Sequence, residues 1–221
     1  MFNVTRPEAV PASLARKIYN HADVVNILKP MFHGKCYLCE RDEIQDVEVE
    51  HFKPHMSIEA DKFDWDNLFY SCSRCNSIKS STHVGLLNCT DNSINVFREI
   101  TLRMSPAIDD DVIVEANNPN PSAETSRTVN LLKLCYNSTN TALRGVSRES
   151  LIEQMYDYMV TFVTARSLLK KPSTGKTIKN GAKEVIEAML DVKHPFSAFW
   201  RWQYLHDSFL NQAYPELENG F

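Results

Sequence analysis

Two pairs of cysteines carry the clearest chemical signal in the sequence. Both pairs have the CxxC spacing: Cys36 and Cys39 lie in CYLC, and Cys72 and Cys75 lie in CSRC. A CxxC turn places two thiolates on one side of the chain, and two such turns complete the tetrahedral four-thiolate set that Zn²⁺ prefers. Because this set leaves no open coordination position, we expect a structural zinc site, which contributes on the order of 10 kcal/mol to folding.

The segment between the two pairs is longer than a plain zinc ribbon requires. It runs over 32 residues, from Glu40 to Ser71. A ribbon typically has about 15–20 residues at this point. The spacing therefore indicates an insertion, and we expect the chemistry of the protein to lie there.

Three pieces of sequence in and beside this insertion resemble the HNH, or ββα-metal, nuclease family. They are VEHFKP at 49–54, WDNLFYSC at 65–72 and CNSIKSS at 75–81, and the match covers about 50 residues, roughly 31–81. In that family a hairpin and a helix hold one divalent metal ion, and many members carry the same double CxxC brace. The resemblance implies a metal-dependent endonuclease that hydrolyses phosphodiester bonds in nucleic acid, with DNA as the favoured substrate.

The resemblance also assigns a role to each matching residue. It makes His51 the general base, because neutral imidazole can take a proton from water near pH 7. It makes Asn67 the residue that bonds backbone groups across the connecting loop and holds the strand of the base in place. Glu50 and Asn76 are expected to ligate a catalytic Mg²⁺ or Mn²⁺, since oxygen donors suit hard cations. Lys79 shares a helix face with Asn76 and is expected to contact the scissile or adjacent phosphate.

Several other residues have simpler interpretations. His55 could contact a metal or a phosphate, although a solvent-facing histidine is the commoner outcome. Cys89 and Cys135 have no CxxC partner and are expected to be small buried residues. The string STGKT at 173–177 invites comparison with a phosphate-binding loop, but Lys170 stands where that motif needs glycine. We therefore reject nucleotide binding there.

The composition is that of an ordinary globular protein of 221 residues, 43% hydrophobic and 24% charged. The net charge of −4 argues mildly against a free-standing, non-specific DNA binder, which usually has a basic surface. The charge is uneven, because residues 40–50 are acidic and residues 166–183 are basic. If the protein cuts nucleic acid, the basic stretch or a partner protein is expected to hold the backbone.

The sequence predicts no contact with a membrane. Its longest apolar-rich stretch, around 159–165, is far short of the roughly 20 residues that span a bilayer. The N-terminal residues lack the charged start and apolar core of a signal peptide. We therefore expect a cytoplasmic protein, and in that compartment paired cysteines are metal ligands rather than disulfides.

The patterns predict an α+β fold in which a zinc-braced ββα-metal HNH core is embedded in a mostly helical protein. The expected elements are one or two short helices within 10–29 ended by Pro30, a strand near 47–52, a turn at 64–68, a short helix from about Cys75, a strand at 112–115, and helices from 124 onward, including 178–191 and 196–213. An aromatic cluster in the last of these is expected to be core. We divide the chain into an N-terminal helical segment (1–30), the HNH core (31–105) and a mainly helical, partner-docking region (106–221).

The rest of the chain resembles one HNH group, the nuclease subunits of Septu-type anti-phage systems, some of which are linked to retrons. This resemblance depends on RPEAVPASL at 6–14 and ETSRTVNLLKLCYNSTNTALR at 124–144. It implies a defence nuclease restrained by an ABC-type ATPase subunit and, in retron-linked systems, a reverse transcriptase and its DNA product as further partners. Two alternatives remain open: an RNase effector, for example one that cleaves tRNA, and a non-catalytic zinc module that binds nucleic acid or protein.

Overall fold

The computed structural model describes residues 1–107, 110–139, 145–219 and 221. Its helices (α), strands (β) and 3-10 helices (η) are, in chain order, α1 Ala12–Ala15, α2 Ala22–Met31, β1 Val47–His51, α3 Glu59–Lys62, η1 Trp65–Asn67, β2 Leu68–Cys72, α4 Ser73–Lys79, α5 Val96–Glu99, β3 Ile100–Arg103, β4 Ile113–Ala116, α6 Ala123–Asn137, α7 Arg148–Lys170, α8 Lys176–Leu190, α9 Ser197–Leu205, α10 Ser208–Ala213 and η2 Pro215–Glu218. Within the described residues the strands form two small antiparallel sheets, β1–β2 and β3–β4. The predicted α+β class is therefore confirmed.

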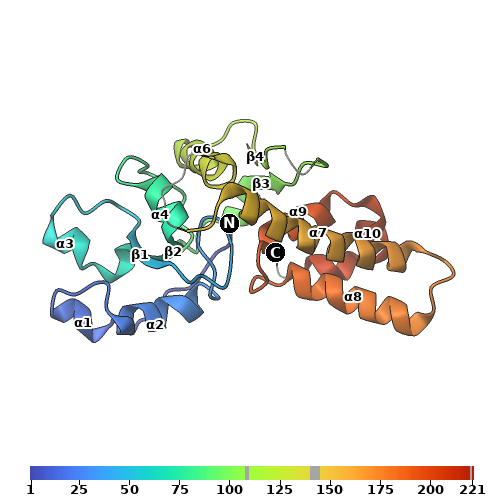
Figure 1. The fold of residues 1–221 in the computed structure, drawn as a ribbon, viewed down its shortest axis with the longest axis horizontal. Coiled ribbons are helices and arrows are strands. Elements are labelled where there is room, and N and C mark those ends of the chain that lie inside the picture. Colours follow the sequence, from blue (N-terminus) through green and yellow to red (C-terminus); the bar gives the residue numbers. More distant parts are fainter. Residues whose placement is uncertain (108–109, 140–144, 220) are drawn as a thin grey trace.

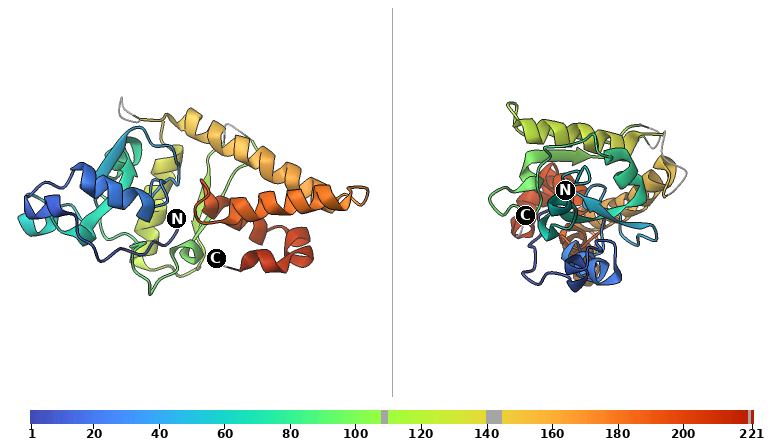
Figure 2. Two further views of the ribbon diagram at one scale, coloured as in Figure 1. Left: turned by 90° about the horizontal axis from the view of Figure 1, so that it is seen from below. Right: turned by 90° about the vertical axis from the view of Figure 1, so that its left-hand side faces the viewer.

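The molecule is elongated, and its two ends differ in character. Figure 1 shows α1 to α4 with the β1–β2 sheet at one end and α7 to α10 at the other, with α6 and the β3–β4 sheet between them. Figure 2 shows that α7 and α8 run antiparallel as a long helical hairpin. Among the residues that the structure describes, no helix is both long and apolar enough to cross a membrane.

The β1–β2 sheet and α4 form a strand–strand–helix unit, as expected. Glu50 lies opposite Phe69 and His51 lies opposite Leu68 in the antiparallel register. Every residue of β2 is buried, because this strand packs between the N-terminal helices and the rest of the core. The helix α4 begins at Ser73, directly after β2, so the second cysteine pair spans the junction of strand and helix.

The aromatic cluster of α9 is buried, as the sequence predicted. Its members are Phe196, Phe199, Trp200, Trp202 and Tyr204, and none is more than 6% exposed. The indole Nε1 of Trp202 donates a hydrogen bond to the carbonyl oxygen of Ile100, at 2.8 Å. This bond ties α9 to β3, so the C-terminal helices are joined to the central sheet.

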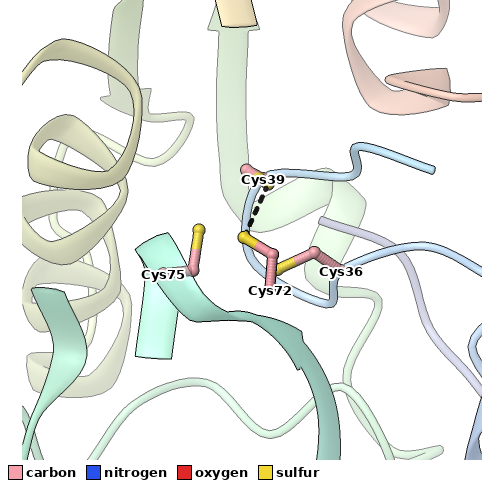
Figure 3. Close-up of side chains that lie close together, drawn as sticks. All are labelled: Cys36, Cys39, Cys72 and Cys75. Carbon is pink, nitrogen blue, oxygen red and sulfur yellow. Dashed lines mark hydrogen bonds between the residues drawn. The ribbon is translucent and has the colours of Figure 1, made fainter. Parts of the chain in front are cut away.

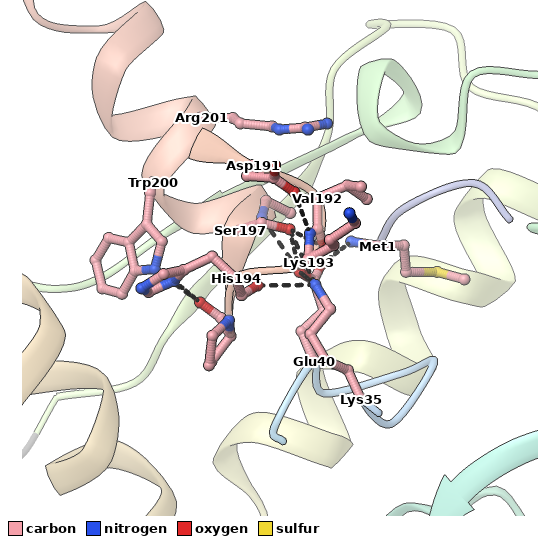
Figure 4. Close-up of polar contacts among 12 residues, drawn as sticks. Met1, Lys35, Glu40, Asp191, Val192, Lys193, His194, Ser197, Trp200 and Arg201 are labelled. Atoms are coloured by element: carbon pink, nitrogen blue, oxygen red, sulfur yellow. Dashed lines mark hydrogen bonds and ion pairs between the residues drawn. The ribbon is translucent and has the colours of Figure 1, made fainter. Parts of the chain in front are cut away.

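A buried polar junction joins α9 to the first cysteine pair (Figure 4). Lys35 and Glu40 are both 0% exposed, and their charged groups lie 3.4 Å apart. Lys35 Nζ donates to the His194 carbonyl oxygen at 2.9 Å and to Ser197 Oγ at 3.1 Å. The Met1 amine lies 2.8 Å from Glu40. Burial alone would raise the pKa of Glu40, but the two adjacent cations lower it to about 2, so the junction contains a charged carboxylate.

Three details differ from the sequence prediction. Pro30 lies in the last turn of α2, where its missing N–H removes only one terminal bond, so it does not stop the helix before residue 30. The predicted helix at 196–213 is two helices, because the Asp207 side chain accepts from Leu210 N–H and begins α10 anew. The strand β3 was not predicted, and its pairing with β4 spans the boundary that we expected at residue 105.

Candidate active site and metal centre

The four cysteines of the two CxxC pairs converge, as Figure 3 shows. Their sulfur atoms all lie within 4.8 Å of one another, and all four residues are 0% exposed. The Sγ atoms of Cys39 and Cys72 are 3.8 Å apart. Zn–S bonds of about 2.3 Å in a tetrahedron require a sulfur–sulfur separation of about 3.8 Å, so these residues fit a structural zinc ion.

Local backbone structure explains how each pair is presented. The Cys36 N–H donates to the Arg41 carbonyl oxygen, and the Glu40 N–H donates to the Cys36 carbonyl oxygen, both at 2.9 Å. Glu40 adopts a left-handed φ of 58°, which closes this turn. We call residues 36–41 the zinc knuckle. The second pair needs no such turn, because Cys72 ends β2 and Cys75 lies in α4.

His51 is the last residue of β1, and its ring is held in one orientation. Its Nε2 lies 3.0 Å from the carbonyl oxygen of Lys62. A carbonyl oxygen can only accept, so Nε2 carries the hydrogen in neutral His51 and Nδ1 keeps its lone pair. The Tyr19 ring also packs edge-on against the imidazole, with centroids 4.6 Å apart. Burial lowers the pKa of His51, which favours the neutral ring near pH 7.

Asn67 bridges the loop that connects β1 to β2. Its Oδ1 accepts from Lys53 N–H at 2.7 Å, and its Nδ2 donates to the carbonyl oxygens of Lys53 at 2.8 Å and Asp61 at 2.9 Å. These are bonds across the connecting loop of the kind that the resemblance assigns to the middle Asn. Because Asp61 is next to Lys62, they also hold the segment whose carbonyl orients His51.

Glu50 lies beneath the cleft in a buried polar network. One carboxylate oxygen is 2.5 Å from Lys79 Nζ, and the other accepts from the Tyr37 hydroxyl at 2.8 Å. Lys79 Nζ also donates to the His51 carbonyl oxygen at 2.9 Å. Burial raises the pKa of Glu50 to about 7, although Lys79 and Tyr37 act in the opposite direction. A divalent cation next to this carboxylate would favour its ionised form.

A cleft of about 460 Å³ brings His51, Glu50 and Asn76 together, whereas Asn67 and Lys79 do not line it. It is lined by Glu50, His51, Pro54, His55, Met56, Ser57, Asn76, Ser80 and Ser81. The base and both expected metal ligands therefore share one opening. Carboxylate and amide oxygens in such a set fit Mg²⁺ or Mn²⁺.

His55 also belongs to this cleft, next to His51. The two ring centroids are 4.7 Å apart. His55 Nδ1 accepts from the Ser57 N–H at 3.0 Å, so the hydrogen of the neutral ring lies on Nε2. Met56 and Ser57 both have left-handed φ values, 45° and 67°, in the turn that makes this bond. The bond leaves His55 as a hydrogen-bond donor rather than a metal ligand through Nε2.

The two remaining predicted residues, Asn76 and Lys79, differ in their exposure to the cleft. Asn76 is partly exposed in the cleft, whereas Lys79 is 0% exposed and is occupied by Glu50 and His51. This burial disfavours the expected contact between Lys79 and a phosphate. Tyr37 was missed by the sequence reasoning, because its only distinction there is a position inside a CxxC pair. Cys89 and Cys135 are buried, as expected.

Comparisons with known proteins agree with this geometry. The family model for HNH endonuclease matches residues 36–82, which include both cysteine pairs and every residue that lines the cleft, so this part of the chain matches an HNH endonuclease domain. The Septu protein PtuB of Bacillus mycoides (strain KBAB4) is 36% identical over 73 residues, covering 26% of this chain and 25% of that relative. The chain thus spans about a quarter of the length of this relative. No solved structure matches the chain.

Proposed function

We propose that the protein is a metal-dependent endonuclease that hydrolyses phosphodiester bonds, with DNA as its substrate. The observation that carries the proposal is the shared cleft of His51, Glu50 and Asn76 within the HNH domain. A zinc module that only bound nucleic acid would not need an oriented imidazole beside two oxygen donors. The zinc site supplies the frame, because a four-thiolate ion has no position open to substrate.

His51 acts as the general base through Nδ1. The bond from Nε2 to the Lys62 carbonyl oxygen fixes the ring and stabilises the imidazolium that forms when Nδ1 takes a proton from water. The resulting hydroxide attacks phosphorus, and the bond from phosphorus to the 3′ oxygen breaks. The products are 5′-phosphate and 3′-hydroxyl ends, and the leaving oxygen takes its proton from solvent.

Glu50 and Asn76 are the residues that would hold the catalytic ion, since they supply a carboxylate and an amide oxygen to the cleft. When bound, Mg²⁺ or Mn²⁺ neutralises the negative charge that develops on the phosphate and on the leaving oxygen. Lys79 is assigned a positioning role in place of the phosphate contact. It contacts both Glu50 and the backbone of His51, so it fixes the strand that carries these two residues.

The protein is further proposed to be the nuclease of an anti-phage system of the Septu kind. The similarity to PtuB supports this role. The partner would be the ATPase subunit of such a system, docked on the C-terminal helices, and the setting would be the cytosol, where thiols stay reduced. A retron reverse transcriptase with its DNA product stays a prediction from the resemblance alone.

A cleavage assay tests the proposal. Zinc-loaded protein is incubated with plasmid DNA and, separately, with total RNA, in Mg²⁺ or in EDTA, with and without a co-purified ATPase partner. We expect Mg²⁺-dependent nicking of DNA. Cleavage of RNA alone would make RNA the substrate and leave the proposed mechanism unchanged. No cleavage of DNA or RNA, even with the partner present, would favour a non-catalytic zinc module.

A further inference from the structure

One residue of the zinc knuckle reaches the active site. Tyr37 lies between Cys36 and Cys39, and its side chain is 1% exposed. Its hydroxyl donates to Glu50 at 2.8 Å, and its backbone N–H donates to the Tyr70 carbonyl oxygen at 3.1 Å. The same residue therefore contacts β2 through its backbone and the carboxylate of β1 through its side chain.

The Tyr37 ring has little freedom to move. It packs against Phe69 with centroids 5.1 Å apart and against Phe32 with centroids 6.3 Å apart. Its backbone belongs to the knuckle whose shape depends on four-cysteine coordination. The position of the hydroxyl is thus set by the cysteine knuckle on one side and by buried aromatic rings on the other.

The two oxygens of Glu50 have different buried partners, Tyr37 on one and Lys79 on the other. Together these donors fix the rotation of the carboxylate plane. Each oxygen retains a further lone pair for a cation, because a carboxylate offers about four acceptor positions. Partners that orient a ligand in this way commonly change metal affinity by about 10–100-fold when they are removed.

We propose that Tyr37 is a positioning residue that orients Glu50 for the catalytic metal, so that the zinc knuckle sets the geometry of the active site. This inference rests on the proposed function, in which Glu50 is a metal ligand. It gives the zinc ion a second consequence besides folding. A change in the knuckle is transmitted to the metal site through one hydroxyl group.

The chain offers a matched control for this idea. The buried hydroxyl of Tyr136 also donates to the knuckle, to the Leu38 carbonyl oxygen at 3.4 Å, which is a backbone group and not the Glu50 carboxylate. Tyr37→Phe therefore removes one buried hydroxyl from the knuckle, and Tyr136→Phe removes one buried hydroxyl of α6 that contacts it. Only the first removes a donor from the carboxylate.

The test compares both variants with the wild type as zinc-loaded full chains. Zinc content, thermal midpoint, Mn²⁺ affinity by calorimetry, and kcat and KM for DNA are measured. For Tyr37→Phe we expect one bound zinc, Mn²⁺ affinity about 10–100-fold weaker, a low rate at limiting Mn²⁺ that recovers at high Mn²⁺, and an unchanged KM for DNA. For Tyr136→Phe we expect wild-type Mn²⁺ affinity.

Two results would overturn the inference while the proposed function stands: wild-type Mn²⁺ affinity in Tyr37→Phe, or equal weakening in both variants, which would indicate a general effect on the knuckle. A wild-type chain that neither binds Mn²⁺ nor cleaves nucleic acid would overturn the proposed function, and this inference with it.

Discussion

The ammonium group of Lys79 lies 2.5 Å from a carboxylate oxygen of Glu50, and the two side chains are 0% and 4% exposed. A buried pair of this kind is sensitive to the loss of one member, because the other charge is left without a partner. We therefore predict that Lys79→Met destabilises the protein by about 3–5 kcal/mol and also abolishes cleavage. Chemical denaturation measures the first effect. If the Lys79→Met variant kept wild-type stability, the result would instead support the phosphate contact that the sequence predicted for Lys79.

A double variant separates charge from packing at this pair. Lys79→Met with Glu50→Gln removes both charges, so part of the lost stability should return, although activity should not, since the metal ligand is changed. No recovery of stability would indicate that the methionine side chain itself does not fit.

His51→Ala should lower the cleavage rate by about 10²–10⁴-fold, the usual contribution of a general base. Stability should change little, because the ring is only partly buried. A suitable control is His206→Ala, since His206 lies in the C-terminal helical region beside Trp202. Undiminished plasmid nicking by His51→Ala at saturating Mg²⁺ would eliminate His51 as the base.

The pH dependence of cleavage should follow the neutral form of His51. Burial lowers the pKa of this group below its ordinary value of 6.5, and a base works when it is deprotonated, so activity should extend to lower pH than an exposed histidine would allow. We expect the acid limb of kcat/KM at saturating Mg²⁺ to have its midpoint below pH 6.5. A midpoint at or above this value would contradict the assignment.

The two asparagines of the site should respond differently to substitution. Asn67→Ala leaves three backbone groups without their partner, so it should lower both stability, by about 1–3 kcal/mol, and activity. Asn76→Ala should weaken Mn²⁺ binding and cleavage with little loss of stability, because Asn76 is partly exposed in the cleft. Denaturation and calorimetry on both variants distinguish a structural residue from a ligand. Equal stability losses would argue against this division.

Removal of zinc should unfold the HNH domain. The site is expected to contribute on the order of 10 kcal/mol, so a strong chelator or Cys72→Ser should abolish cleavage and remove the part of the circular dichroism signal that the HNH domain contributes. Cys89→Ala lies outside the cluster and should retain one zinc per chain by metal analysis. A folded, zinc-free protein would show that the four cysteines are not a structural site.

The sequence was informative where chemistry depends on spacing along the chain. The CxxC pairs predicted a four-sulfur cluster because this spacing can bring two sulfur atoms to one side of the chain, in a turn as at Cys36 and Cys39 or at a strand–helix junction as at Cys72 and Cys75. His51, Asn67 and Asn76 were placed by their order between and beside the pairs. In the structure His51 ends β1, Asn67 ends η1 and Asn76 lies in α4, so all three belong to elements that are close along the chain. Whether they carry out catalysis is for the variants above to decide.

Partnerships between distant residues were beyond sequence reasoning. The acidic run 40–50 did not reveal its ion pairs. In the structure Glu40 pairs with Lys35, Asp46 with Arg41 of the same run, and Glu50 with the distant Lys79. The burial of Lys79 was missed for the same reason, since helix periodicity gives a face but not the residue that it meets. The strand β3 was missed because its four residues are too few to show the alternating pattern of a strand, and three of them in a row are buried.

The buried junction of Lys35, Glu40 and Ser197 has a consequence for how the chain can be divided. A fragment that ends at residue 105 would lose Ser197 and the His194 carbonyl oxygen. The charged side chains of Lys35 and Glu40 would then be exposed without these partners. The HNH end of the molecule is thus joined to the last helices at Glu40, the residue that follows Cys39. A partner protein that binds those helices would therefore be coupled mechanically to the zinc knuckle.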